Sequence, residues 1–328
     1  MVKIIAEAGT NHGGSVETAR ELTRVAAAVG ADVVKFQMLY AEGLYVPGTW
    51  SGEHYTPSEV FALRRQQELT EAEWLEVHKE ATRTGIPLAF SIFDERGLAF
   101  QEQISPPFIK IASCDLNNIP FLRKVAATGR KILLATGMAT LQEIEDAVTA
   151  IVSEGNTDIT LMHCVSVYPC PTERTNLSFI SVLKTAFGFP VGFSDHTESS
   201  VAACVAVALG AEWLEKHITL DRKAVGFDHS YAMEPHMFRD YVADVRAVES
   251  ACKPQVPKVS DEEMNTRRRA RRSLYAARAL RRGETLRPED VLIVRPEGPL
   301  SPADLTRIVG RKLNRDVKQY EALTWDMF

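Results

Sequence analysis

The chain has 328 residues, and its 38 Lys and Arg against 43 Asp and Glu give a formal net charge of −5. Hydrophobic residues make up 45% and charged residues 25%, which excludes a largely disordered chain. The acidic balance argues against general nucleic-acid binding, and no segment approaches the roughly 18 apolar residues of a membrane helix. Five scattered cysteines without a C-x-x-C pair predict a reduced, cytoplasmic protein.

From the N-terminus, short β-branched runs alternate with segments of helical period. Residues 2–9 predict a strand, and residues 15–30 predict a helix with Ser15 as N-cap and Gly30 just past its end. After a second strand comes a long insertion, 38–69, which we expect to be irregular. Strands are predicted at 32–37, 87–93, 108–113, 131–137, 159–165, 191–195 and 213–219. Further helices are predicted at 72–85, 119–129, 141–155, 179–188, 198–210 and 235–251.

This alternation predicts the fold of the first 252 residues. About eight β-then-α units in this length are typical of a (β/α)₈ TIM barrel, and apolar runs are typical of parallel strands covered by helices. An open doubly wound sheet is the alternative, but the G-x-G-x-x-G spacing expected after its first strand is absent.

The pattern changes near residue 253. Residues 253–270 are polar, contain two prolines and predict a linker, and residues 271–328 predict a small, mostly β domain. Such a domain buries little apolar area alone, so we expect it to dock on another surface. Five arginines within 267–272 indicate a solvated linker or a contact with an acidic neighbour rather than nucleic-acid binding.

The catalytic groups of a barrel lie at the carboxyl ends of its strands. We therefore take the polar residues at those ends, and in the loop after the last strand, as candidates. They are Glu7, Lys35, Gln37, Ser91, Lys110, Ser113, Asp115, His163, Ser166, Tyr168, Ser194, Asp195, His196, Glu215, His217, Asp228 and His229.

Two lysines, Lys35 and Lys110, stand inside apolar runs, where a charge is costly unless it is paired or bound to an anion. Their convergence on one barrel mouth predicts an anionic substrate carrying phosphate or carboxylate. One alternative is a structural ion pair of each lysine with Glu7 or Asp115. Another is a lysine that forms a Schiff base.

Two histidines, His196 and His217, end adjacent predicted strands. Two imidazoles near carboxylates predict a divalent-metal site with open positions, and hydrogen-bonded core histidines are the alternative. We expect His163 to pack near the rim and Cys164 to be a core residue rather than a nucleophile. The remaining histidines outside strand ends are expected on loops or helix surfaces: His12, His54, His78 and His236.

Eight ordered motifs resemble one family: EAGTNHGG, VVKFQ, FIKIASCDLNN, LLATGMATLQEIEDA, HCVSVYPCP, GFSDHT, LEKHITLDR and GFDHSYAMEP. Together they resemble the sialic acid synthases, which comprise the N-acetylneuraminate, legionaminate and pseudaminate synthases. The tail, RRSLYAARALRRGETLRPEDVLIVRPEG, is similar to the C-terminal antifreeze-like (SAF) domain of that family. The resemblance covers nearly the whole chain.

The resemblance implies a transferase that condenses phosphoenolpyruvate with an N-acetylmannosamine-type aldehyde sugar and releases phosphate by C–O cleavage. It implies a manganese or magnesium ion on His196 and His217. It implies catalytic roles for Glu7, Lys35, Lys110 and Asp115, with Glu7 or Asp115 as general acid or base. The implied substrate-binding residues are Gln37, Ser91, Phe93, Ser113, Ser166, Tyr168, Ser194, Asp228 and Arg295.

The resemblance also implies a domain-swapped homodimer in which the tail of one chain covers the barrel of the other. Arg295 matches the tail arginine that contacts the acyl group of the sugar. The chain departs from the family at Ala135, where Ser is usual, and at Ser166, where the neuraminate branch has Asn. The GFDH form, with His229, is closer to the neuraminate and legionaminate branches. The acceptor sugar therefore stays open.

Two other functions remain as alternatives at this point. One is a Schiff-base aldolase of a related sugar acid that uses Lys110. The other is a sugar-binding protein that uses the tail domain.

Overall fold

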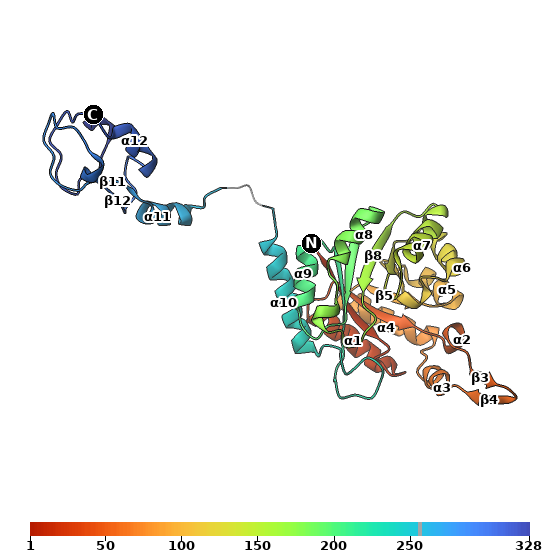
Figure 1. The fold of residues 1–328 in the computed structure, drawn as a ribbon. Helices are drawn as coiled ribbons and strands as arrows, with labels where there is room; N and C mark the ends of the chain where they lie inside the picture. The colour runs from red at the N-terminus through yellow and green to blue at the C-terminus, as the bar shows by residue number, and fades with distance from the viewer. Residues whose placement is uncertain (255–257) are drawn as a thin grey trace. The chain divides into compact units, whose positions relative to one another are not determined.

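The computed structural model describes residues 1–254 and 258–328, which form two compact units, Met1–Lys253 and Pro254–Phe328 (Figure 1). The first unit is a closed barrel of eight parallel strands, in the order β1-β10-β9-β8-β7-β6-β5-β2. These strands are β1 (Lys3–Gly9), β2 (Val33–Met38), β5 (Leu88–Ile92), β6 (Ile109–Ile111), β7 (Ile132–Ala135), β8 (Ile159–Cys164), β9 (Val191–Asp195) and β10 (Trp213–His217). The predicted (β/α)₈ barrel is confirmed.

Helices cover the barrel and follow its strands in sequence (Figure 1). They are α1 (Val16–Ala28), α4 (Glu71–Thr84), α5 (Glu95–Ile104), α6 (Ile119–Ala126), α7 (Leu141–Ser153), α8 (Phe179–Phe187), α9 (Val201–Ala208) and α10 (Pro235–Ala251). Ser15 caps α1 by accepting a hydrogen bond from the Thr18 amide, as expected. The sequence pattern did not predict the helix α5, although Asp94 caps it by accepting a hydrogen bond from the Gly97 amide.

The alternation of side chains along each strand separates two cores and aims the site residues. Ile4 packs in the outer core between strands and helices, and Ile5 packs in the core inside the barrel. Because side chains alternate along a strand, Glu7 shares the inward face with Ile5 at the carboxyl end of β1. On β2, Phe36 packs outward between the inward-facing Lys35 and Gln37.

The segment 38–69, predicted as irregular, has structure of its own. It contains α2 (Ala41–Leu44), a hairpin of β3 (Gly48–Ser51) with β4 (His54–Pro57), and α3 (Glu59–Gln66). Ser58 caps α3 by accepting from the Phe61 amide. These short elements were missed because each is only four to eight residues long, below the length at which periodicity is informative.

The second unit has its own small core. Its helix α11 (Asp261–Ala270) occupies ten residues of the segment predicted as a linker, and Ser260 and Glu263 form its capping box. Two antiparallel strands follow, β11 (Ser273–Ala276) and β12 (Val291–Val294), with a short helix α12 (Leu305–Ile308). The core residues are Leu274, Ala276, Leu280, Leu286, Leu300, Ile308, Leu313, Val317, Leu323 and Met327.

Among the described residues, no helix is long and apolar enough to cross a membrane. The five cysteines, all outside the three residues without description, are free thiols.

Candidate active site

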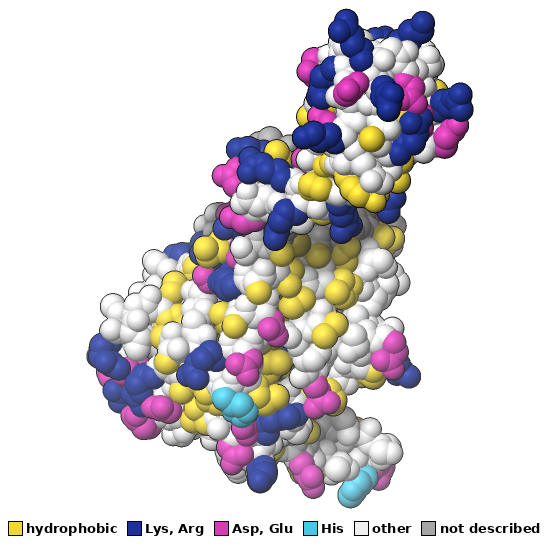
Figure 2. Space-filling model, turned by 90° about the vertical axis from the view of Figure 1, so that its left-hand side faces the viewer, with side chains coloured by type: hydrophobic (Ala, Val, Ile, Leu, Met, Phe, Trp, Pro, Cys, Tyr) yellow, Lys and Arg dark blue, Asp and Glu magenta, His cyan; other side chains and the backbone are white. Residues whose placement is uncertain are grey.

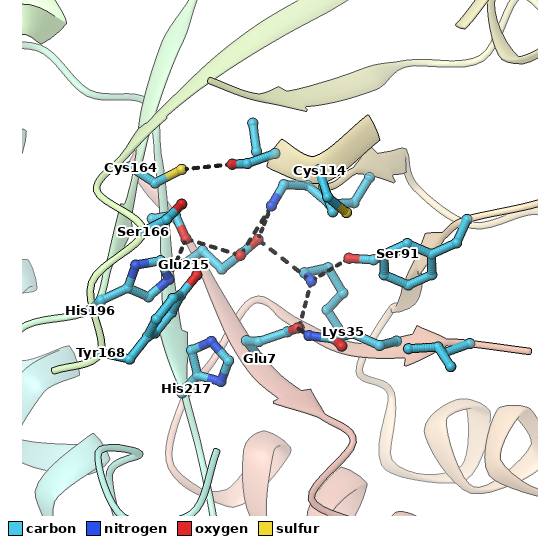
Figure 3. Close-up of a pocket in the computed structure, with 18 of the residues that line it drawn as sticks. Glu7, Lys35, Ser91, Cys114, Cys164, Ser166, Tyr168, His196, Glu215 and His217 are labelled. Atoms are coloured by element: carbon cyan, nitrogen blue, oxygen red, sulfur yellow. Dashed lines mark hydrogen bonds and ion pairs between the residues drawn. The ribbon is translucent and has the colours of Figure 1, made fainter. Parts of the chain in front are cut away.

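A cavity of about 360 Å³ opens where the barrel strands end. Its wall brings together residues from β1, β2, β5, β6, β7, β8, β9 and β10 (Figure 3). The predicted site residues in that wall are Glu7, Lys35, Gln37, Ser91, Phe93, Lys110, Ser113, Ser166, Tyr168, Ser194, His196 and His217.

A buried network of two lysines and two glutamates forms the floor of the cavity. Lys35 Nζ lies 2.6 Å from Glu7 Oε2 and 3.7 Å from Glu215 Oε2. Lys110 Nζ donates to both carboxylate oxygens of Glu215 at 3.1 Å. Glu215 therefore contacts both ammonium groups, and Figure 3 shows it beside Lys35. All four side chains are nearly inaccessible, so their charges are stable only as a mutually paired set.

Neutral side chains complete this network. Lys35 Nζ donates to Ser91 Oγ at 2.8 Å, Gln37 Nε2 donates to Glu7 Oε1 at 3.1 Å, and the Ser194 hydroxyl donates to Glu215 at 3.1 Å. The alternative of structural ion pairs thus describes Lys35 correctly, since it pairs with Glu7. For Lys110 the partner is Glu215 rather than Asp115.

The network favours the charged forms of Glu215 and Lys110. Burial raises the pKa of the Glu215 carboxyl, but Lys110 and Lys35 outweigh it and bring that pKa to about 2. Burial lowers the pKa of the Lys110 ammonium, but the facing Glu215 carboxylate outweighs it and the net pKa is raised. Lys110 is therefore a protonated cation at neutral pH rather than a free amine nucleophile.

A small cradle of hydroxyl and amide groups lies beyond Lys110. The Gly137 amide donates to Ser113 Oγ at 3.1 Å, and Ser113 Oγ lies 3.2 Å from Cys164 Sγ. A Cβ at Gly137 would come within 2.8 Å of Ser113, Cys164 and Ser166 side-chain atoms, so only glycine fits there. Burial raises the pKa of the Cys164 thiol, which agrees with its expected core role.

The two candidate metal ligands face each other on adjacent strands. The His196 and His217 rings are 5.7 Å apart between centroids. His196 Nδ1 donates to the Val165 carbonyl at 2.8 Å, which leaves Nε2 as the lone-pair nitrogen toward Ser194 Oγ, 3.5 Å away. His217 Nδ1 is buried without a hydrogen-bond partner. Burial, reinforced by His217, lowers the pKa of His196 to about 3.

These two imidazoles suit a divalent ion. The carbonyl behind His196 orients its ring as expected for a metal ligand, and the buried Nδ1 of His217 lacks any other partner. Residues 1–254 and 258–328 contain no cluster of three or more His, Cys, Asp or Glu side chains arranged for a metal. An ion here would therefore take its remaining ligands from water and substrate.

Three of the site residues that the family resemblance implies lie outside the cavity wall. Asp115 is buried in a one-turn helix, Ser113–Asp115, where Asn118 Nδ2 donates to its Oδ1 at 3.3 Å. Asp228 accepts from the Tyr231 hydroxyl at 2.5 Å, and its Oδ2 lies 4.0 Å from His217 Nδ1. Arg295 is exposed and belongs to the second unit.

Three side chains of the site have no role assigned from the sequence. Glu215 was a strand-end candidate without a role, because an alternating strand does not reveal which lysine a carboxylate will meet. Arg64 lines the cavity from α3, in the segment predicted as irregular. Tyr231 packs its ring 5.2 Å from His217 and from Tyr168 between centroids. The only signal for the last two was their place in long loops of a barrel.

The histidines outside the cavity mostly follow expectation. His163 Nε2 donates to the Thr175 carbonyl at 2.7 Å, and its ring stacks on Phe193, so it packs near the rim as predicted. His12 lies in the loop after β1, as expected for a loop residue, and it is buried there against Trp74. The reason is the long helix α4, whose Trp74 covers the loop after β1.

A closed parallel barrel with paired lysines, a hydroxyl cradle and two facing imidazoles defines a TIM-barrel protein with a polar, charged cavity at the standard functional end. The chain belongs to the NeuB family, which it matches over residues 22–256. Residues 271–328 match the SAF domain.

Named relatives are similar along nearly their whole length. The N,N'-diacetyllegionaminic acid synthase of Legionella pneumophila is 32% identical over 98% of this chain and 93% of its own. The human N-acetylneuraminate-9-phosphate synthase is 32% identical over 98% of this chain and 90% of its own. The crystal structure of N-acetylneuraminic acid synthetase from Leptospira borgpetersenii, in complex with citrate, is 32% identical with a TM-score of 0.72. The match covers 81% of this chain and 90% of the Leptospira chain.

Proposed function

We propose that this protein is a nonulosonic acid synthase, a transferase that joins phosphoenolpyruvate to an N-acylated mannose-type aldehyde sugar and releases phosphate. The observation that carries the proposal is the paired Lys35–Glu7 and Lys110–Glu215 network beside His196 and His217 in a NeuB-family barrel. The names of the relatives support a product of the sialic acid class.

Phosphoenolpyruvate binds, in this proposal, at the end of the cavity that holds Lys110, Ser113 and the Gly137 amide. Charge-assisted hydrogen bonds from an ammonium group, with hydroxyl and backbone donors, are the usual means of holding a phosphate. The anion competes with Glu215 for Lys110, and Lys35 and Ser194 remain to stabilise that carboxylate. Binding therefore redistributes an existing network rather than burying a new charge alone.

The aldehyde end of the acceptor meets the two imidazoles. A divalent ion, Mn²⁺ or Mg²⁺, held by His196 and His217 would polarise the aldehyde oxygen as a Lewis acid. His196 presents Nε2 because its Nδ1 proton is held by the Val165 carbonyl. Tyr168, whose ring centroid lies 4.3 Å from that of His196, forms an aromatic wall for the sugar.

The reaction has two bond-forming steps and one bond cleavage. C3 of phosphoenolpyruvate attacks the aldehyde carbon, forming the C–C bond and placing positive charge at C2. Water adds to C2 and loses a proton, and the C2–O bond to phosphate then breaks. Glu7 is the better placed general base or acid, because it lines the cavity whereas Asp115 does not.

The Schiff-base alternative is disfavoured by the state of Lys110. An imine requires a neutral amine, and the raised pKa of Lys110 beside Glu215 keeps its ammonium protonated. Borohydride trapping with substrate would give an adduct on Lys110 only in that alternative.

The test is phosphate release from phosphoenolpyruvate with a panel of N-acyl hexosamine aldehydes, with and without chelator. Phosphoenolpyruvate labelled with ¹⁸O at the bridging oxygen should yield labelled phosphate, because C–O cleavage leaves that oxygen on phosphorus. Each sugar without phosphoenolpyruvate is the control. Failure of every acceptor, with sugar binding retained, would instead support a sugar-binding protein.

A further inference from the structure

Arg64 is a buried cation of the cavity wall without an acidic partner. Its side chain is 8% exposed, and it lines the cavity together with Gln37 and Tyr45. Among the described residues, no carboxylate forms a salt bridge with it within 4.0 Å. Nη1 donates to Thr10 Oγ1 at 2.8 Å, and Nε is buried with no hydrogen-bond partner. A guanidinium group has five N–H donors, so most of its capacity is unused.

The surroundings of Arg64 hold the guanidinium in place without neutralising it. Its Cζ lies 3.7 Å from the centroid of the Phe227 ring, over which it stacks. Burial first, and then the charge of Arg64, lower the pKa of the neighbouring His12 to about 4, so that imidazole is neutral. Stacking and one hydroxyl fix the orientation of the group, and the charge remains available to a ligand.

Arg64 also determines the sign of the net charge of the cavity wall. The four other ionised side chains in the wall cancel, because Lys35 and Lys110 face Glu7 and Glu215. Arg64 is the additional cation within the described wall, so the wall carries one excess positive charge. A buried charge without a partner is costly, and an anionic ligand removes that cost.

The position of Arg64 separates it from the phosphate cradle. Thr10 follows β1, and Phe227 lies in the loop after β10, which is the neighbour of β1 in the barrel. The cradle of Ser113 and Gly137 follows β6 and β7. In the closed order of strands β7 lies opposite β1, so the two cationic regions face each other across the mouth.

We propose that Arg64 binds an oxyanion of a substrate at the side of the cavity opposite the phosphate cradle. The proposal rests on the synthase function proposed above. Two substrates could bring this oxyanion: phosphoenolpyruvate through its carboxylate, or an acceptor sugar through an anionic substituent such as a phosphate ester. The guanidinium fork suits either, since both present two oxygens in a plane.

The test compares Arg64→Gln with Arg65→Gln, which removes the same charge from the next residue. Arg65 is half exposed and pairs with Glu42 on the surface, so it serves as a matched control. Thermal unfolding of both variants establishes that they are folded. The first arm measures equilibrium binding of phosphoenolpyruvate without acceptor. The second compares kcat/KM for N-acetylmannosamine and N-acetylmannosamine 6-phosphate.

We expect Arg64→Gln to lower either the affinity for phosphoenolpyruvate or the kcat/KM for the phosphorylated acceptor. The decrease should be roughly 10- to 150-fold, which corresponds to the loss of one charge-assisted contact. Weaker phosphoenolpyruvate binding assigns the oxyanion to its carboxylate. A loss confined to the phosphorylated acceptor assigns it to the sugar. Arg64→Lys, which keeps the charge without the planar fork, should recover only part of the loss.

The proposal is overturned if Arg64→Gln matches Arg65→Gln within twofold in both arms. The proposed function fails separately, if the unaltered protein releases no phosphate with any acceptor. In that case the binding arm still reports on Arg64, because it requires no turnover.

Discussion

At the scale of single residues, the site depends on Glu215. Its carboxylate accepts from Lys110 and Ser194 and lies 3.7 Å from Lys35, so it links two strands that bear the cationic groups. A carboxylate in this position raises the pKa of the Lys110 ammonium and keeps it protonated. In the proposed reaction, an incoming phosphate would compete with Glu215 for Lys110.

Lys110→Met should therefore affect both stability and binding. It leaves Glu215 buried with its other cation 3.7 Å away, so we expect the free energy of unfolding to fall by about 3–5 kcal/mol. Phosphoenolpyruvate affinity should fall by roughly 10- to 150-fold. Denaturant titration and calorimetry measure the two effects. Adding Glu215→Gln should restore part of the stability without restoring binding. Unchanged affinity would make Lys110 purely structural.

His217→Ala should weaken Mn²⁺ binding by at least about tenfold, because it removes one of only two imidazoles in the cavity wall. Equilibrium dialysis against Mn²⁺ measures the affinity directly. His236→Ala is the control, since that side chain is largely exposed and outside the cavity wall. Full turnover of the metal-free protein, with its metal content verified, would contradict the metal assignment.

At the scale of elements, the loop between β1 and α1 shows how neighbouring helices hold the site. His12 Nδ1 accepts from the Gly14 amide at 3.1 Å, and its ring meets Trp74 of α4 edge-on at 5.3 Å between centroids. Gly9, just before this loop, has a φ of +54°. A Cβ there would lie 3.1 Å from Asp228 Oδ2, so glycine permits the close approach of the loop after β10.

The buried His12 predicts a specific pH dependence of stability. Its pKa falls from 6.5 to about 4 on folding, mainly through burial, so the unfolded chain binds more protons between those values. Its contribution to the free energy of unfolding should therefore be complete above pH 6.5 and decline as the pH falls to about 4. Protonation of Nδ1 also removes the acceptor for Gly14.

Urea titrations from pH 7 to pH 4 test this dependence. His12→Gln should flatten the slope relative to the unaltered protein, whereas His54→Gln, on the exposed hairpin strand β4, should not. An identical slope in His12→Gln would show that His12 does not titrate in this window.

At the scale of the whole molecule, charge is divided unevenly between the two units. Residues 254–328 carry 16 Lys and Arg against 11 Asp and Glu, whereas residues 1–253 carry 22 against 32. Figure 2 shows Lys and Arg side chains interspersed with Asp and Glu on the visible face of the C-terminal unit. Opposite net charges favour association of a basic tail with an acidic barrel, within one chain or between two.

Arg295→Ala and His217→Ala chains, mixed and refolded together, test the domain-swapped homodimer that the family resemblance implies. If the tail of one chain completes the barrel of the other, half of the dimers are mixed and each has one intact site. About a quarter of the activity of the unaltered protein should then return. Each variant alone is the control. No recovery, with mixed dimers verified by native mass spectrometry, would show that each tail serves its own barrel or none.

The sequence by itself determined the eight strands, the barrel class, the second domain and most residues of the cavity wall. It did so because strand alternation and capping are local, and because a barrel collects its strand ends at one mouth. Only the tertiary structure decided that Lys110 meets Glu215, 105 residues away, and that Asp115 points elsewhere. Only the tertiary structure showed that Arg64 lines the cavity and that His12 is buried. The physical reason is that strand order and register arise from closure of the sheet and the packing of loops over it, which no local pattern encodes.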